Sequence, residues 1–139
     1  MVAKRRRVAD PRAVLSNAFL GATISRLDFS DAELVSVSGP ALILLDRCSF
    51  SGADLRHANL DKWHFNLCDL RGANLRGASL RGAWFAGCDL TGADLRDTDL
   101  AYAFFGSMGV GAGEIETRLD NTLGDPAALR TSPWPTESS

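Results

Sequence analysis

Residues 48–105 read CSFSGADLRHANLDKWHFNLCDLRGANLRGASLRGAWFAGCDLTGADLRDTDLAYAFF, and a five-residue repeat runs through the whole stretch. Every fifth position is large and apolar: Phe50, Leu55, Leu60, Phe65, Leu70, Leu75, Leu80, Phe85, Leu90, Leu95, Leu100 and Phe105. Two positions before each of these, eleven of the twelve units have a small residue, and Trp63 is the exception. An α-helix repeats about every 3.6 residues and a β-strand about every two, so neither explains a strict period of five. The stretch therefore predicts a coil built from five-residue units.

A slower period of twenty residues indicates how many sides each coil has. Phenylalanine recurs at 65, 85 and 105, cysteine at 48, 68 and 88, and arginine at 56, 76 and 96. Residues that stack in successive coils are therefore four units apart, which predicts four sides per coil. Glycine fills the last position of many units, at 52, 72, 77, 82, 87 and 92, where a corner can use a positive φ.

Three units carry Ala-Asp-Leu or Ala-Asn-Leu after a glycine, namely Ser51–Leu55, Arg71–Leu75 and Thr91–Leu95. They resemble the A(D/N)LXX unit of pentapeptide-repeat proteins, and the match continues in register over about residues 48–107. The resemblance implies an all-β fold: a right-handed quadrilateral parallel β-helix of about 4–5 coils with a short irregular C-terminal cap or tail. Some members of this family act as DNA mimics that bind type II topoisomerase and modulate quinolone sensitivity.

The quality of the repeat divides the chain into four segments. Residues 1–14 are predicted to form a basic, flexible arm, residues 15–47 degenerate coils, residues 48–107 the regular solenoid, and residues 108–139 a degenerate repeat, cap and tail. In the last segment, Val110 and Ile115 still hold the phase of the repeat.

The degenerate coils before residue 48 keep the five-residue spacing, but they lie one residue out of phase with Phe50. The residues that keep the spacing are Phe19, Ile24, Phe29 and Leu34. One extra residue must therefore enter the chain, and we expect a bulge near residues 39–40, at Gly39-Pro40. Trp63 lies in the next coil, and we assign it a structural role in a widened part of the solenoid.

The stacked cysteines are the first candidates for chemistry. Cys48, Cys68 and Cys88 occupy the small slot that alanine fills elsewhere, and a buried cysteine packs as a small apolar side chain. We therefore assign them to the structural core with the twelve large apolar residues, rather than to a metal site. The periodic aspartates are explained by hydrogen bonds to the adjoining turn. The sequence has no catalytic motif, so we expect no catalytic residues, no metal and no cofactor.

Outward positions suggest an interaction surface. His64, Trp84 and Phe104 each precede one of the stacked phenylalanines, so we predict an exposed aromatic stripe with Tyr102 at its edge. Two interpretations stay open: the stripe binds a partner, or the C-terminal tail with Trp134 folds across it.

Charge is unevenly spread, although the net charge is only −2. Residues 1–14 carry five basic and one acidic side chain, and residues 86–139 carry nine acidic and three basic ones. A short basic run is a weak basis for nucleic-acid binding, so we do not expect nucleic acid as a partner. The longest apolar run has five residues, so no membrane association is expected. Three cysteines, an odd number, favour a reducing compartment and hence the cytoplasm.

We therefore predict a non-catalytic interaction or scaffold module that binds a protein partner through one flat face. The identity of the partner is open, and so is the formation of a homodimer. The alternative function, implied by the resemblance, is a DNA-mimicking modulator of DNA gyrase or topoisomerase. Against this alternative, arginines at 56, 71, 76, 81 and 96 interleave with the aspartates, whereas a DNA mimic presents an extended acidic face.

Overall fold

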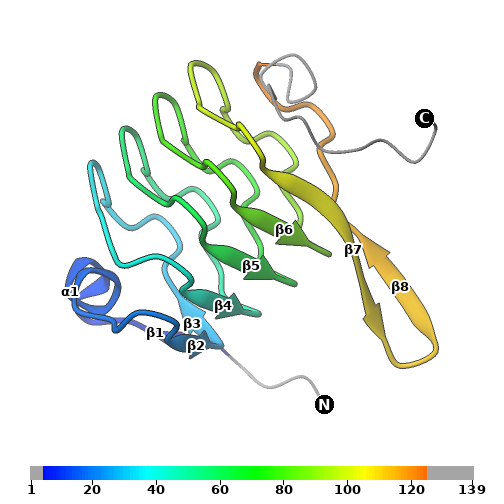
Figure 1. Cartoon of the computed structure of the whole chain (residues 1–139), viewed down its shortest axis with the longest axis horizontal. Coiled ribbons are helices and arrows are strands. Elements are labelled where there is room, and N and C mark those ends of the chain that lie inside the picture. Colours follow the sequence, from blue (N-terminus) through cyan, green and yellow to red (C-terminus); the bar gives the residue numbers. More distant parts are fainter. Residues whose placement is uncertain (1–4, 125–139) are drawn as a thin grey trace.

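The structure, a computed structural model, describes residues 5–124 as a solenoid of about five turns (Figure 1). Its main sheet has six strands in the order β2-β4-β5-β6-β7-β8, namely Thr23–Ser25, Leu44–Asp46, His64–Asn66, Trp84–Ala86, Phe104–Val110 and Gly113–Glu116. The first five strands pair in parallel along one side of the solenoid, and β8 returns antiparallel to β7. Single parallel bridges continue the same stacking on other sides. The predicted all-β solenoid is confirmed.

Each corner of the coil is made by one residue with a positive φ. From Arg47 to Tyr102 such a residue occurs at every fifth position, with φ between 53 and 73°. Half of these twelve corners are glycines, and the others are Arg47, His57, Lys62, Leu67, Asp97 and Tyr102. Strands one coil apart pair residues twenty positions apart, so each coil has four corners and four sides.

The polar residue before most of the large apolar residues closes the following turn. The side chain of Asp54 accepts a hydrogen bond from the backbone N–H of Arg56, two residues further on, at 3.3 Å. The same bond recurs from Arg76 to Asn74 at 3.1 Å, and from the N–H groups of Arg71, Thr91, Arg96 and Ala101 to the aspartate two residues earlier. A short polar side chain of this kind favours the turn over continued strand, which gives each side its short length.

The interior is filled by the large apolar residue of every unit. Eleven of the twelve are at most 1% exposed, and Phe105, in the last coil, is partly buried. The rings of Phe65 and Phe85 stack at 4.8 Å between centroids, and those of Phe85 and Phe105 at 5.0 Å. A continuous apolar core therefore runs along the axis.

The three cysteines lie in this core as unpaired, buried thiols. Burial raises the pKa of the Cys48 thiol, and it raises that of Cys68 well above the usual range. Both groups are therefore held in the unreactive neutral form at physiological pH.

The N-terminal end of the solenoid is covered by an ordered segment. Strand β1, Arg6–Arg7, pairs in parallel with β3, Leu27–Asp28. Helix α1, Pro11–Ser16, follows, and its Leu15 side chain is fully buried at the end of the core. Residues 5–14 thus lie against the first coil, which differs from the flexible arm expected from their charge, because Leu15 anchors them in apolar surface. Phe19 keeps the repeat spacing but is 80% exposed rather than internal.

The pairing between neighbouring coils shows where the one-residue shift of the repeat occurs. Ser38 pairs with Asn59, twenty-one residues further on, whereas Leu44 pairs with His64, twenty residues further on. The corners at Ser36 and Leu42 are six residues apart instead of five. The extra residue therefore lies between Ser38 and Leu42, the stretch that contains Gly39-Pro40.

Trp63 fills the space that this extra residue creates. Its indole is fully buried, and its Nε1 donates a hydrogen bond to the carbonyl of Pro40 at 3.1 Å. A Cβ atom on Gly39 would lie 2.9 Å from the indole and 2.7 Å from the carbonyl oxygen of Leu15, so only glycine fits there. The bulge, the indole and α1 are therefore packed as one unit.

At the other end, the repeat is interrupted rather than gradually lost. β7 and β8 form a hairpin on which Val110 and Ile115 are 38% and 46% exposed, so the expectation that these residues hold the coil phase is wrong. The coil resumes after the hairpin: Arg118 pairs with Asp89, twenty-nine residues earlier instead of twenty, so the hairpin inserts nine residues. Residues 125–139, including Trp134, lie outside the described residues, and so does the interpretation that the tail covers the stripe.

Candidate functional site

The side of the solenoid that carries β4 to β7 has a column of outward apolar side chains. Strand register aligns Leu44, His64, Trp84 and Phe104 on four successive strands. The rings of His64 and Trp84 stack with centroids 5.5 Å apart, and those of Trp84 and Phe104 lie 4.6 Å apart. Trp84 is 39% exposed, and its three neighbours are half-buried. The predicted stripe residues therefore do lie together, with Trp84 at the centre.

A second column lies on the adjoining corner. Leu42, Lys62, Gly82 and Tyr102 succeed one another there at twenty-residue spacing, each with a positive φ of 63–68°. Leu42 and Tyr102 are 50% and 45% exposed. We call the combined surface the apolar edge, which consists of Leu42, Leu44, His64, Trp84, Tyr102 and Phe104.

Two of these residues, Leu42 and Leu44, were not predicted from the sequence. Each stands twenty residues before a member of the same column, Lys62 and His64. The sequence therefore contains the signal, but it lies before the start of the regular repeat at residue 48.

Cations lie beside the aromatic part of the apolar edge. The guanidinium of Arg81 stands 5.9 Å from the centre of the Tyr102 ring and also pairs with Asp99 at 3.0 Å. Lys62 occupies the corner between Leu42 and Gly82, and a Cβ atom on Gly82 would touch its stem at 3.4 Å. The centre of the apolar edge is therefore apolar, and the basic side chains of Lys62 and Arg81 lie along its corner.

A different surface of the solenoid is lined with arginine–aspartate pairs. Arg56 binds Asp54 with two parallel hydrogen bonds of 2.8 and 2.7 Å, and Arg96 binds Asp94 with bonds of 3.0 and 2.8 Å. These bonds hold the pKa of both carboxyl groups below the usual range. The outward aspartates therefore do not add up to an unbroken acidic face.

Two further properties concern the described part of the chain alone. Within residues 5–124, no three side chains of the ligand types His, Cys, Asp and Glu come together as a metal ion would require. The same residues include no helix with the length and apolar character of a membrane span.

Comparison with known proteins agrees with this geometry. The sequence model of the family "Pentapeptide repeats" matches eight copies, over residues 48–85 and 73–106. No curated protein matches the sequence. Among solved structures, the pentapeptide repeat protein Rfr23 from the cyanobacterium Cyanothece 51142 is 28% identical with a TM-score of 0.57, over 76% of this chain and 63% of that chain. The present chain thus spans less than two thirds of that protein.

Two other solved structures are more distant. A pentapeptide repeat protein from the Arabidopsis thaliana thylakoid lumen is 22% identical with a TM-score of 0.44, over 76% of this chain and 77% of its own. QnrB1, a plasmid-mediated fluoroquinolone resistance protein, is 20% identical with a TM-score of 0.45, over 90% of this chain and 55% of its own.

The fold places this protein in the structural class of β-solenoids with four-sided coils. Because the family model matches the regular coils over residues 48–106, this part of the chain consists of pentapeptide repeats.

Proposed function

We propose that this protein is a non-catalytic interaction module whose apolar edge binds one amphipathic helix of a partner protein. The observation that carries the proposal is the ring stack of His64, Trp84 and Phe104 on the outer side of the sheet. Continuous aromatic surface of this kind, exposed at its centre, is typical of binding sites and of the residues that dominate binding energy.

The size of the apolar edge favours a helix over a globular face. From Leu44 to Phe104 it crosses four strands, which corresponds to about 14 Å at about 4.8 Å per strand. A helix about 10 Å wide would cover that length with roughly nine residues. A standard interface buries about 800 Å² per partner, far more than this strip presents, so a homodimer formed through the apolar edge alone would be weak. The helix fits with its apolar side on Trp84 and acidic residues toward Lys62.

Trp84→Glu is expected to weaken helix binding by roughly 30-fold or more, because it places a charge in the centre of the apolar contact. The probe is a set of amphipathic helices selected against the wild-type chain from a display library, with affinities measured by surface plasmon resonance. Arg56→Glu is the matched control, since Arg56 lies on a different side and its change should leave the affinity as it is. Selected helices that bind the Trp84→Glu variant as tightly as the wild type would contradict the proposal.

The rival function, mimicry of DNA toward DNA gyrase, is tested separately. Asp54, Asp69 and Asp94 are each bound by an arginine at 2.7–2.8 Å, so these three aspartates do not form the continuous acidic face of a DNA mimic. We therefore expect no effect of the protein on gyrase supercoiling, even at high molar excess. Inhibition or protection of gyrase in that assay would replace our proposal with the rival one.

The proposal includes a cytoplasmic location. It is supported by the three free thiols, which a reducing compartment preserves.

A further inference from the structure

The hairpin of β7 and β8 projects from the solenoid as a two-stranded ribbon. Figure 1 shows it extending beyond the ends of β4, β5 and β6. Only the first three residues of β7, Phe104 to Gly106, pair with β6, and the rest of β7 pairs with β8 alone. All four residues of β8 are exposed. The repeat of the coil does not account for this ribbon, so we asked what it could bind.

The base of the ribbon is fixed to the coil before it. Thr117, directly after β8, accepts a hydrogen bond from the backbone N–H of Cys88 on its Oγ1 at 3.0 Å. A Cβ atom on Gly87 would lie 2.9 Å from the Cβ of Met108 and 3.1 Å from the carbonyl oxygen of Ile115, so the ribbon rests on this glycine corner. A segment that is already held in place loses little conformational freedom when a partner binds.

One edge of β8 has no neighbouring strand. β8 is the last strand of the six-stranded sheet, and within the described part of the chain it pairs with β7 alone. The backbone N–H of Thr117 donates to the carbonyl of Gly106 at 3.1 Å, and hydrogen-bonded pairs alternate along an antiparallel ladder. The backbone groups of Ile115 are therefore turned toward β7, whereas those of Glu114 and Glu116 are turned toward the open edge. Such an edge is a template for another strand.

The side chains of the ribbon are divided between two faces. Because successive residues of a strand alternate, the register places Met108, Val110 and Ile115 on one face. Val110 and Ile115 are exposed, so this apolar face is partly open. Glu114 and Glu116 lie on the opposite face. A strand added to the edge therefore meets two acidic positions with an apolar position between them.

The two glutamates have no basic partner. Among the residues that the structure describes, neither Glu114 nor Glu116 forms an ion pair. Glu114 accepts a hydrogen bond from the neutral hydroxyl of Ser107 at 2.9 Å, and the nearby Arg118 pairs with Asp120 at 3.2 Å. Unpaired like charges on one face attract a ligand of the opposite charge.

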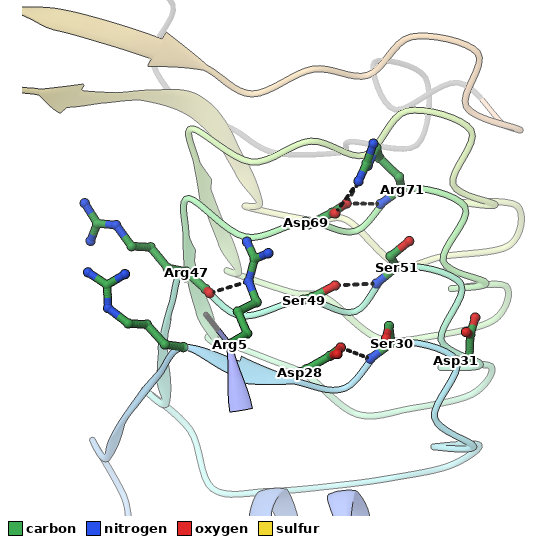
Figure 2. Close-up of a pocket in the computed structure, with 10 residues that line it drawn as sticks. Arg5, Asp28, Ser30, Asp31, Arg47, Ser49, Ser51, Asp69 and Arg71 are labelled. Carbon is green, nitrogen blue, oxygen red and sulfur yellow. Dashed lines mark hydrogen bonds and ion pairs between the residues drawn. The ribbon is translucent and has the colours of Figure 1, made fainter. Parts of the chain in front are cut away.

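Another side of the solenoid, shown in Figure 2, has charged side chains that already bind other groups of the chain. Arg71 binds Asp69 with bonds of 2.9 and 2.7 Å. Arg5 donates to the carbonyl of Arg47 at 2.7 Å. These residues line a hollow of about 800 Å³, but the guanidinium of Arg47 points away from Ser51. The arginines there are not directed at one ligand, in contrast to the two glutamates, which share one face of one strand.

A second copy of this chain does not suit the open edge. In antiparallel pairing of two β8 strands around Ile115, Glu114 of each copy would face Glu116 of the other. In parallel pairing without a shift, each glutamate would face its own counterpart. Like charges directly opposite each other destabilise a strand pair. The edge therefore favours a basic strand over its own copy.

We propose that the open edge of β8 binds an extended segment of a partner protein as a further strand, with basic residues opposite Glu114 and Glu116 and an apolar residue opposite Ile115. The backbone of the segment pairs with the free N–H and C=O groups of the two glutamates, and its basic side chains neutralise the two carboxylates. Its apolar side chain covers Ile115 and Val110. This site does not depend on the apolar edge.

The test is a titration of the full chain with the capped peptide Thr-Lys-Val-Lys-Thr at constant ionic strength, followed by NMR. We expect saturable shifts and slower hydrogen exchange at the amides of Glu114 and Glu116. The peptide Thr-Glu-Val-Glu-Thr has the same strand preference but the opposite charge, and it should bind at least tenfold more weakly. A fully N-methylated copy of the basic peptide keeps both charges but has no backbone N–H to donate, so it should also bind at least tenfold more weakly.

Protein variants test the same contacts from the other side. The double variant Glu114→Gln, Glu116→Gln should bind the basic peptide about tenfold more weakly, because it removes both charge pairs. Asp31→Asn with Glu33→Gln is the matched control, since it removes two exposed acidic side chains elsewhere and should leave the affinity unchanged. Trp84→Glu should also leave it unchanged, which separates this site from the proposed function.

Two results would show that the attraction is nonspecific and would overturn the proposal. They are equal affinity for the N-methylated peptide, and an equal loss of affinity in the two double variants. A dimer of the peptide-free chain that protects the amides of Glu114 and Glu116 from exchange would assign the edge to a second copy, and would overturn it as well. Thermal unfolding verifies that each variant is folded, and the peptide comparisons use the wild-type chain, so they decide the proposal even if a variant is destabilised.

Discussion

Trp63→Ala is expected to destabilise the protein by about 3–5 kcal/mol, the usual cost of truncating a fully buried aromatic side chain. Most other units have alanine at this position, so the repeat pattern alone predicts that the change should not destabilise the protein. The structure predicts the reverse, because the indole fills the space next to the Gly39-Pro40 bulge and donates to the carbonyl of Pro40. Urea unfolding followed by circular dichroism measures the change.

A second variant separates the loss of volume from the loss of the hydrogen bond. Trp63→Phe keeps a buried ring but removes the indole N–H, and it should cost less than Trp63→Ala while leaving the Pro40 carbonyl without its partner. If Trp63→Ala unfolds at the same urea concentration as the wild type, the coil can collapse around the bulge, and the proposed role of the indole is wrong.

Phe85→Ala is expected to cost a similar amount, about 3–5 kcal/mol. The Phe85 ring lies between Phe65 and Phe105, at 4.8 and 5.0 Å, and is fully buried. Its removal opens a cavity in the middle of the axial stack, and the coils on either side cannot close it without breaking their strand pairing. The change in the free energy of unfolding is again measured in urea.

Phe105→Ala provides the matched comparison for this prediction. The same ring is removed from the same column, but in the last coil, where it is only partly buried. We therefore expect a clearly smaller loss of stability than for Phe85→Ala. Equal losses would mean that the ring in the last coil contributes as much to stability as the ring in the middle, and that the end of the solenoid is as well packed as its middle.

The five- and twenty-residue spacing by itself determined the coil, its four sides and the identity of its core. Each regular unit has a large apolar residue inside and a corner residue with positive φ, such as Gly72, and most units also have a polar residue that closes the turn. Stacking then follows, because each coil contacts only its neighbours. The same spacing placed Trp84 outside and next to His64 and Phe104.

Only the tertiary structure decided what happens where the repeat is broken. The packing of Trp63 with the bulge and Leu15 joins residues that are far apart in sequence, and no period relates them. The hairpin that inserts nine residues before Arg118 and the hydrogen bond from Arg5 to the carbonyl of Arg47 also join segments that the repeat does not relate. A repeat specifies the contacts that it repeats, whereas these sites depend on single contacts between different segments, which exist only once the coils have stacked.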